Sequence, residues 1–338
     1  MHIGIAGIGL YLPKQYMTAA DLARATSVPE EVIALKFGIK KKPVAGPDET
    51  TSYLGLRAAQ AALDDAAIKA QDIDLVIWCG GQHKDYPCWL AGLYVANQIG
   101  ARRAWSFDME AMCGSMMAAI DVAKSLMLVR DDLNTVLLVS GYRNNDLIDL
   151  TYSPTRFMMD IGSAGSACVL KKNLGRNVLM ASAFRGDGSL SETCVVPVLG
   201  SRVWPPRPED VEHASFFVPD EQAFKQKLND ITMPNFYTVI RESMRKSGFG
   251  EHQIDYLAIL HFKRSAHLAV LKELGLREEQ STYLEEYGHL GQNDQLLSIK
   301  LGLETGKIGE GSRVVMVGAG LGFVWASTVV QWGVYKGL

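Results

Sequence analysis

The sequence predicts an α/β fold in which a sheet buried on both faces is covered by helices. Two patterns carry this prediction: short apolar runs rich in β-branched residues, and longer segments with helical spacing between them. The chain has 338 residues, of which 48% are hydrophobic and 21% are charged. This composition is ordinary for a globular protein with a large core.

The strand candidates are near-continuous apolar runs, which suit strands that are covered on both sides. They are residues 74–79, 135–140, 166–170, 256–260 and 314–317. The helix candidates are residues 51–66, 114–128, 223–247 and 293–305. We expect Pro234 to interrupt the third of these helices, because proline removes a backbone donor.

The two halves of the chain have a similar rhythm, which predicts an internal duplication. The strand at residues 73–77 (IDLVI) resembles the strand at 255–259 (DYLAI). With a join near residues 172–175, residues 1–173 form an N-terminal half and residues 174–338 a C-terminal half. Residues 197–220 hold five prolines and little periodicity. We expect a loop excursion there, either a binding element or a simple connector.

Charge and cysteine usage argue against several classes of protein. The net charge of -3 gives no reason to expect a nucleic-acid partner. Residues 1–7 read as a first strand instead of a signal peptide, and no apolar run approaches the roughly 20 residues of a membrane helix. We therefore predict a cytoplasmic protein. The five cysteines are scattered without a C-x-x-C pair, which argues against a disulfide framework and against a metal site.

Cys113 is the strongest local signal for chemistry. It follows a strand-like segment at residues 104–107 and opens a helix pattern with the small residues Gly114 and Ser115. A thiol at a helix N-terminus is stabilised as the thiolate, which is the form that attacks acyl thioesters. The alternative is a buried structural cysteine.

Several stretches of the chain, in order, resemble the β-ketoacyl-acyl-carrier-protein synthase III family of thiolase-fold condensing enzymes. They are residues 5–13 (IAGIGLYLP), 37–42 (FGIKKK), 47–50 (PDET), the Cys113 segment, 306–308 (GKI) and 318–325 (GAGLGFVW). The resemblance runs from residue 3 to about residue 331. It implies a five-layered αβαβα fold built from two duplicated halves, and a homodimer.

The resemblance also implies a ping-pong reaction with acyl-CoA and a malonyl thioester as substrates. No cofactor is expected beyond the coenzyme A or phosphopantetheine thioesters themselves. An acyl group moves to Cys113, and a malonyl thioester then loses carbon dioxide and attacks it. The thioester carbonyl needs an oxyanion hole, for which the family suggests the backbone N–H groups of Cys113 and Leu321.

The family holds the enolate of the second thioester with a histidine and an asparagine. His261 matches the histidine, although one residue late, and His267 is an alternative. His289 takes the place of the asparagine, which would give a Cys–His–His set. A neutral imidazole can still donate one N–H to an enolate oxygen. Asn293 could reach the site instead if the loop is remodelled.

Carrier binding departs from the family pattern, since Val32 replaces the expected tryptophan. The candidate residues for substrate or carrier binding are Lys36, Arg156, Lys263, Arg264 and Asn293. A basic patch at a tunnel mouth would suit the acidic helix of an acyl carrier protein. The candidate residues of the acyl pocket are Tyr86, Trp89 and Met112; the segment around Trp89 matches one that crosses the family's dimer interface.

Three functions fit these residues. The first is decarboxylative condensation in specialised lipid or polyketide synthesis. The second is a non-condensing acyltransferase or thioesterase that uses the same acyl-Cys113. The third is a weakly active partner subunit of a synthase, against which the intact cysteine argues.

Overall fold

The computed structural model describes residues 1–80 and 83–337. Its main sheet has nine strands in the order β5-β4-β6-β7-β1-β8-β11-β10-β9. The strand bounds are β1 Ile3–Tyr11, β4 Leu75–Cys79, β5 Trp105–Met109, β6 Thr135–Tyr142, β7 Ala164–Lys172, β8 Arg176–Gly186, β9 Tyr256–Ile259, β10 Arg313–Gly320 and β11 Val324–Val334. A small antiparallel pair, β2 (Gln15–Thr18) and β3 (Lys41–Val44), lies apart from it.

The main sheet repeats one strand order in its two halves. From the centre outward, one half runs β1-β7-β6-β4 and the other runs β8-β11-β10-β9. In each half the two inner pairs of strands are antiparallel and the outermost pair is parallel. The halves join at β1 and β8 through a single residue pair, Gly4 and Val178. This repeat supports the predicted duplication, whereas the division after residue 173 remains a prediction.

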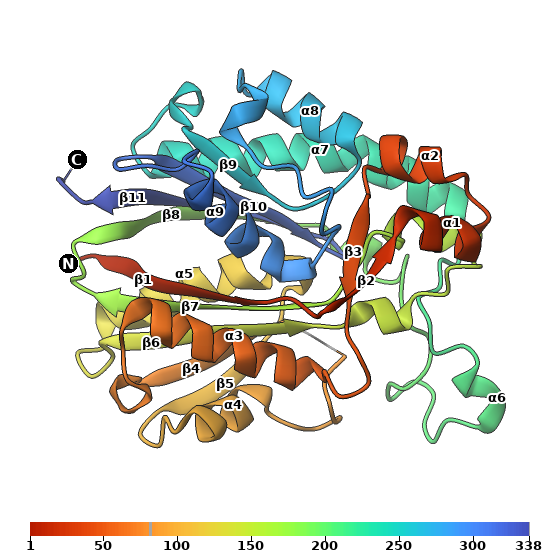
Figure 1. Cartoon of the computed structure of the whole chain (residues 1–338), viewed down its shortest axis with the longest axis horizontal. Helices are drawn as coiled ribbons and strands as arrows, with labels where there is room; N and C mark the ends of the chain where they lie inside the picture. Colours follow the sequence, from red (N-terminus) through yellow and green to blue (C-terminus); the bar gives the residue numbers. More distant parts are fainter. Residues whose placement is uncertain (81–82, 338) are drawn as a thin grey trace.

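Five layers are visible in Figure 1, with helices outside, between and beyond the two half-sheets. Helices α3 (Thr51–Ala66) and α4 (Ala91–Ile99) cover the outer face of the N-terminal half-sheet. Helices α5 (Ser115–Val129) and α9 (Asp294–Glu304) fill the space between the half-sheets, and α7 (Glu221–Lys246) and α8 (Arg264–Glu273) form the last layer. The remaining helices are α1 Ala19–Thr26, α2 Glu30–Val32 and α6 Pro208–Val211.

The strands alternate their side chains between two apolar layers. In β4, Leu75 and Ile77 join the core around α5, whereas Val76 and Trp78 pack toward α3 and α4. Both faces are covered, so every residue of β4 is buried and the run is apolar throughout.

Within the part of the chain that the structure describes, one helical stretch, residues 112–129, is long and apolar enough to cross a membrane. It includes α5, which lies between the two half-sheets. Contact with a sheet on each side accounts for its apolar composition, as in the central helix of any layered protein.

The predicted interruption at Pro234 is wrong, because α7 runs unbroken from Glu221 to Lys246. Pro234 is exposed. The carbonyl group that lacks its helical donor is therefore on the solvent side, and the packing of the buried face of the helix is kept. Strands β8 and β11 were not among the sequence candidates. They lie in the middle of the sheet, and polar residues such as Asn177, Ser182, Ser327 and Thr328 interrupt their apolar stretches.

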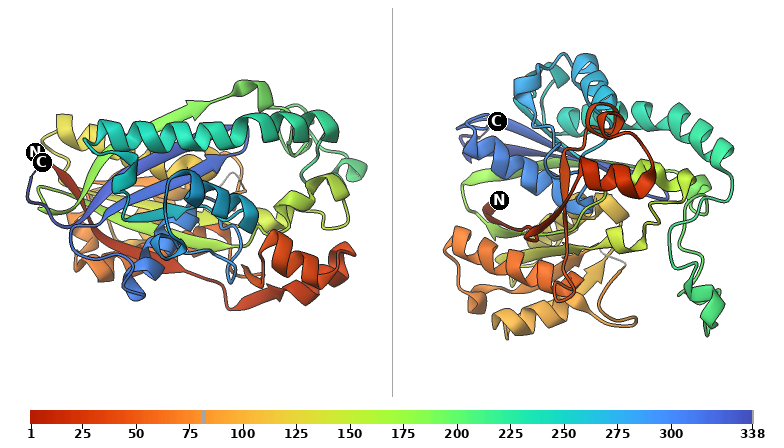
Figure 2. Two further views of the ribbon diagram at one scale, coloured as in Figure 1. Left: turned by 90° about the horizontal axis from the view of Figure 1, so that it is seen from above. Right: turned by 45° about the vertical axis from the view of Figure 1, so that its right-hand side comes forward.

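The segment at residues 197–220 is an excursion, as predicted. It carries α6 on a long loop that stands away from the body of the molecule (Figure 1 and the right-hand view of Figure 2). Its base is closed by backbone hydrogen bonds between Val195 and Phe217. Phe216, at the same base, reaches the cavity described below.

Candidate active site

Cys113 lies in a tight turn between β5 and α5. The 3-10 turn Met112–Gly114 runs directly into α5. The Ser115 hydroxyl donates to the Met112 carbonyl at 2.6 Å and accepts the Ala111 N–H at 2.8 Å. Met112 has a φ of 47°, a left-handed conformation that costs a non-glycine residue roughly 1–2 kcal/mol. The turn thus holds a half-buried thiol at the start of α5.

The end of β10 packs tightly against this turn. A Cβ at Gly320 would lie 2.4 Å from the carbonyl oxygen of Ala111, and one at Gly318 would lie 3.1 Å from that of Cys113. Leu321, the residue after β10, lines the same cavity as Cys113. The two N–H groups expected to form the oxyanion hole therefore belong to neighbouring segments, and that role remains a prediction.

His289 connects Cys113 to a buried carboxylate. Its Nε2 lies 3.3 Å from the Cys113 sulfur, and its Nδ1 lies 2.6 Å from Oδ2 of Asp294. Asp294 is fully buried and also accepts the Leu290 N–H at 2.7 Å. An ionised carboxylate only accepts hydrogen bonds, so Nδ1 carries a proton and Nε2 faces the thiol. Cys113, His289 and Asp294 thus form one connected series with the order that nucleophile, base and orienting carboxylate have in acyl-transfer sites.

The pKa of His289 is raised well above its usual range. Burial acts against the charged imidazole, but the negative charges of Asp294 and Cys113 and their hydrogen bonds to the ring outweigh burial. The charged form of the His289 imidazole is therefore favoured beside Cys113 and Asp294.

His261 lies in the same cavity, but its ring is turned to other partners. Its Nδ1 lies 2.8 Å from Oδ2 of Asp160, and its Nε2 lies 3.1 Å from the carbonyl oxygen of Gly38. Both ring nitrogens therefore face acceptors within the protein. Its backbone N–H donates to Asp294 at 2.8 Å. The structure places His261 beside the site without aiming it at Cys113, and its predicted catalytic role remains untested.

His267, the alternative histidine, does not belong to this cavity. It is buried in α8 and faces a polar cleft lined by Arg264, Glu278 and Lys307. Burial lowers its pKa to about 4.

A buried lysine supports the segment that carries Asp160. Lys42 is 3% exposed, and its Nζ donates to the carbonyl oxygens of Met159 and Ile161, at 2.8 Å each. Burial lowers the pKa of Lys42 to about 8, although Asp160 acts in the opposite direction. Burial also opposes ionisation of Asp160, but His261, His289 and Lys42 together keep the Asp160 pKa below its usual value.

Tyr142, which was not among the sequence candidates, is a further polar side chain beside Cys113 and His289. It is 3% exposed and lines the cavity, with its ring centroid 6.4 Å from that of His289. A Cβ at Gly291 would lie within 2.6–2.8 Å of the Tyr142 ring. Burial raises the Tyr142 pKa well above its usual value, as do the charge of Cys113 and a hydrogen bond to it. The phenol therefore remains protonated and faces the sulfur.

These side chains surround a cavity of about 300 Å³. Its wall is mostly apolar and includes six phenylalanines, Phe37, Phe157, Phe216, Phe236, Phe262 and Phe323. An apolar pocket with a few convergent polar groups is the usual form of a small-molecule site.

Comparisons with known proteins identify the family of the chain. Two family models match the chain. The model of 3-oxoacyl-[acyl-carrier-protein] synthase III matches residues 107–188, and the model of the C-terminal part of the same synthase matches residues 244–332. The β-ketoacyl-[acyl-carrier-protein] synthase III of Symbiobacterium thermophilum is 28% identical over 337 residues and is aligned over 98% of both chains. The chain belongs to the β-ketoacyl-acyl-carrier-protein synthase III family. It is a divergent member with a synthase III-like transferase activity.

Solved structures confirm the predicted thiolase-like fold. The synthase III of Thermus thermophilus superposes with a TM-score of 0.84 at 24% identity, covering 98% of this chain and 100% of its own. The priming β-ketosynthase of the R1128 polyketide pathway also gives 0.84, at 19% identity, covering 99% and 97%. The fold assignment made from sequence is therefore correct.

In this synthase III family member, Asn293 does not face a substrate. It is fully buried, its Oδ1 accepts from the Ser166 hydroxyl at 2.6 Å, and its Nδ2 donates to the Leu290 carbonyl at 2.7 Å. The prediction that Asn293 binds substrate or carrier is therefore wrong, because its amide is fully used within the core. Between the two alternatives, the structure brings His289 to Cys113 and keeps Asn293 away.

The predicted basic residues differ in whether they line the cavity and in whether they are paired with an acidic side chain. Lys263 lines the cavity and is exposed, with its Nζ 5.6 Å from the Phe37 ring centroid. Arg264 is instead paired with Glu278 at 3.2 Å. Lys36 and Arg156 are exposed and do not line the cavity. Only Lys263 of this set is positioned to meet a molecule that enters toward Cys113.

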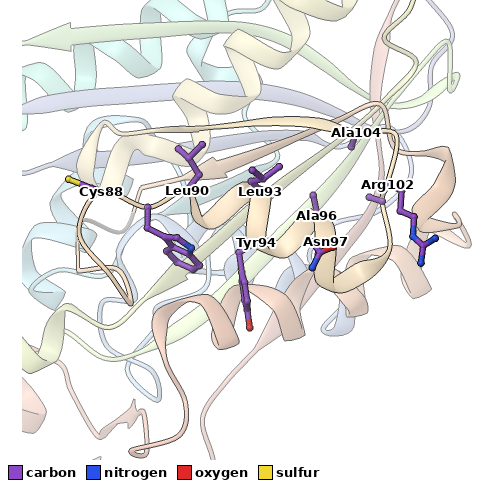
Figure 3. Close-up of a pocket in the computed structure, with 10 residues that line it drawn as sticks. Cys88, Leu90, Leu93, Tyr94, Ala96, Asn97, Arg102 and Ala104 are labelled. Carbon is purple, nitrogen blue, oxygen red and sulfur yellow. The ribbon is translucent and has the colours of Figure 1, made fainter.

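The predicted acyl-pocket residues separate into two places. Met112 lines the Cys113 cavity, whereas Tyr86 is 64% exposed and Trp89 lines a groove of about 670 Å³ along α4. Figure 3 shows this groove with Leu90, Leu93 and Tyr94 along it. Within one chain, Tyr86 and Trp89 therefore do not reach the cavity. Among the described residues, no group of three or more His, Cys, Asp or Glu side chains is placed to hold a metal ion.

Proposed function

We propose that the protein takes an acyl group from a coenzyme A or phosphopantetheine thioester onto Cys113 and condenses it with a malonyl thioester. The single observation that carries this proposal is the contact of 3.3 Å between the Cys113 sulfur and His289 Nε2, with Asp294 behind the ring. Membership of a family of condensing enzymes supports the second step.

Loading begins with transfer of the Cys113 proton to His289. The thiolate attacks the thioester carbonyl, and the oxyanion is held by the N–H groups of Cys113 and Leu321. The C–S bond of the donor then breaks, and the leaving thiolate takes the proton from His289. Asp294 keeps the imidazole in the required tautomer and stabilises its charged form throughout.

Condensation follows in the same cavity. His289 first takes up one proton from solvent at Nε2. The malonyl thioester then loses carbon dioxide, and this Nε2–H group donates a hydrogen bond to the enolate oxygen. The enolate carbon attacks the acyl-Cys113 carbonyl, the Cys113 thiolate leaves, and a β-ketoacyl thioester forms. The leaving thiolate lies beside the protonated imidazole of His289, so the Cys113–His289 pair is restored for the next cycle with a net uptake of one proton.

A second candidate function is acyl transfer without condensation. It is favoured by the engagement of both His261 nitrogens with Asp160 and Gly38 and by the burial of Asn293. These contacts leave His289 without the second donor that a decarboxylating site of this family uses. A Cys–His–Asp series also suits removal of a proton from an acceptor hydroxyl, amine or water.

Two measurements separate these functions. Intact-protein mass spectrometry after incubation with a panel of acyl-CoA donors tests loading of Cys113. Addition of malonyl-CoA or malonyl-acyl carrier protein then tests for carbon dioxide and a β-ketoacyl product. Acyl-Cys113 that persists with every malonyl donor, but is discharged by alcohols, amines or water, contradicts condensation and supports the second function.

The partners follow from the same proposal. Lys263 at the cavity suits an acidic carrier protein or the phosphates of coenzyme A. A homodimer is supported by the exposed apolar side chains on the α4 side of the molecule: Leu90 is 47% exposed, Leu93 51% and Trp105 42%. Trp105 belongs to β5, the terminal strand of the sheet, and such edges are commonly covered by a partner. A cytoplasmic location is part of the proposal.

A further inference from the structure

Asp160 is the only acidic residue among the described residues that line the Cys113 cavity. Its side chain is 13% exposed, whereas the side chain of His261 beside it is 0% exposed. Nδ1 of His261 donates to Oδ2 of Asp160 at 2.8 Å, and Nε2 of the same ring lies 3.1 Å from the Gly38 carbonyl oxygen. A molecule in the cavity therefore meets the Asp160 carboxylate, which His261 supports from the protein side.

The second carboxylate oxygen, Oδ1 of Asp160, has no hydrogen bond to any residue that the structure describes. Burial opposes ionisation of this carboxyl group, but His261, His289 and Lys42 hold its pKa below the usual value. An ionised carboxylate only accepts hydrogen bonds. A ligand that displaces water from Oδ1 without donating to it leaves a charged oxygen unpaired, which weakens binding. The cavity therefore favours a ligand that brings an N–H or O–H group to Asp160.

The backbone of Asp160 also positions His289. The His289 N–H donates to the Asp160 carbonyl at 2.9 Å, and the Gly162 N–H donates to the His289 carbonyl at 2.9 Å. Both side chains line the cavity, and the charge of His289 acts on the Asp160 carboxyl group. A molecule that takes the acyl group from Cys113 therefore meets two atoms that accept hydrogen, Nε2 of His289 and Oδ1 of Asp160.

We propose that this acyl acceptor is a primary amine and that Asp160 binds it through an N–H···Oδ1 hydrogen bond. The inference rests on the second function proposed above, transfer of the acyl group without condensation. The nitrogen of a primary amine carries two hydrogens, one for His289 as the base and one for Asp160. The attacking oxygen of an alcohol carries only one. Water carries two, but the phenylalanine-rich wall favours an amine with an apolar substituent.

The transfer step balances without a further reactant. The amine nitrogen attacks the carbonyl carbon of acyl-Cys113, so that an N–C bond forms and the C–S bond breaks. One proton passes from the nitrogen to Nε2 of His289 and then to the leaving thiolate. The products are an amide and the free Cys113 thiol. Asp160 holds the remaining N–H group throughout and exchanges no proton.

The test starts from acyl-Cys113 that has been separated from its donor, so that only the second step is measured. Benzylamine, N-methylbenzylamine and benzyl alcohol are added separately, and intact-protein mass spectrometry follows the loss of the acyl group. Asp160→Asn keeps an oxygen for His261 and places an amino group where Oδ1 stood. Asp132→Asn, at a carboxylate that is 65% exposed, is the control.

Asp160→Asn is expected to slow discharge by benzylamine about 10- to 100-fold, the effect of losing one hydrogen bond to a charged group. Discharge by N-methylbenzylamine and by benzyl alcohol should change little, because each has a single hydrogen and gives it to His289. Equal slowing with all three molecules, or an unchanged rate with benzylamine, overturns the inference.

The wild type gives an independent answer if Asp160→Asn does not fold. Its preference for benzylamine over N-methylbenzylamine should exceed that of a free acyl thioester in solution by about tenfold or more, and an equal preference overturns the inference. Failure of the proposed function gives a different result, since no donor then acylates wild-type Cys113. Calorimetry of benzylamine with the unacylated proteins then tests Asp160 alone. Weaker binding to Asp160→Asn supports the inference, and equal affinity overturns it.

Discussion

The Nδ1 of His289 lies 2.6 Å from Oδ2 of Asp294, at the buried start of α9. The same carboxylate oxygen accepts the backbone N–H of His261 at 2.8 Å. One aspartate thus fixes the imidazole that faces Cys113 and the strand end that carries the second histidine. Asp294 acts through these neighbours and is a positioning residue.

Asp294→Asn is expected to slow acyl loading by about 10²- to 10⁴-fold, in line with the loss seen when a triad carboxylate becomes an amide. The amide cannot stabilise the imidazolium and favours the wrong tautomer. The rate of Cys113 alkylation by iodoacetamide, measured against pH, checks this. Its profile should move toward that of an ordinary thiol, whereas Asp132→Asn, at a largely exposed carboxylate, keeps the wild-type profile. An unchanged profile in Asp294→Asn would contradict the role.

Cys113→Ala is expected to abolish the acyl adduct for every donor. The adduct is observed directly as a mass increase of the intact protein. Cys88→Ala provides the control, because Cys88 is the exposed free cysteine and lies in the α4 groove away from His289. An adduct that survives in Cys113→Ala would place the nucleophile elsewhere.

Tyr142→Phe keeps the ring packed on Gly291 and removes only the hydroxyl. We expect kcat for loading to fall about tenfold, the effect of losing one hydrogen bond to a charged group, with KM little changed. The alkylation profile of Cys113 should also shift to higher pH. A role limited to packing would leave both kcat and this profile at wild-type values.

Gly320→Ala is expected to inactivate the protein, because the added Cβ meets the Ala111 carbonyl at 2.4 Å and must displace the nucleophile turn. Gly309→Ala is the control, since a Cβ there meets no atom within 4 Å. Steady-state loading rates and circular dichroism compare the two. A folded, fully active Gly320→Ala protein would show that the turn tolerates movement.

The raised pKa of His289 predicts a pH dependence of stability. Its folded-state pKa lies above the ordinary value of about 6.5, so its contribution to the free energy of unfolding is complete below that pH. The contribution is lost as the pH rises through the folded-state pKa. Urea unfolding of the wild type and of His289→Gln at several pH values measures it. The difference between the two proteins should shrink toward alkaline pH, and a difference that grows would contradict the shift.

Much of the fold could be predicted because the outer strands of each half are buried on both sides. Helix α3 was predicted with its observed bounds, Thr51–Ala66, since its apolar spacing is regular. Strands β8 and β11 were missed because central antiparallel strands with small and polar residues have no such run. Helix α7 continues through Pro234 because this residue lies on the exposed side of the helix, which the sequence alone does not reveal.

The site could be predicted only where a residue type carries its own chemistry. Cys113 was identified in this way, whereas His289 was reached through the family resemblance, and the structure brings the two into contact. Asp294 and Tyr142 were not identified, because a buried carboxylate and a strand tyrosine have no spacing signal and gain their roles from tertiary contacts. Asn293 was misassigned for the same reason, since sequence does not show which side of a loop faces the core.

The single residue pair between β1 and β8 has a mechanical consequence. Cys113 lies just before α5 and His289 just before α9. Besides the Gly4–Val178 pair, the seam between the half-sheets is held by the hydrogen bond from the Asn177 amide to the Ile5 carbonyl and by the packing of α5 against strands of both half-sheets. A small shear along that seam would change the sulfur-to-nitrogen gap directly. The reactivity of the thiol therefore depends on how firmly α5 is held between the two half-sheets, as well as on the pairing of β1 with β8.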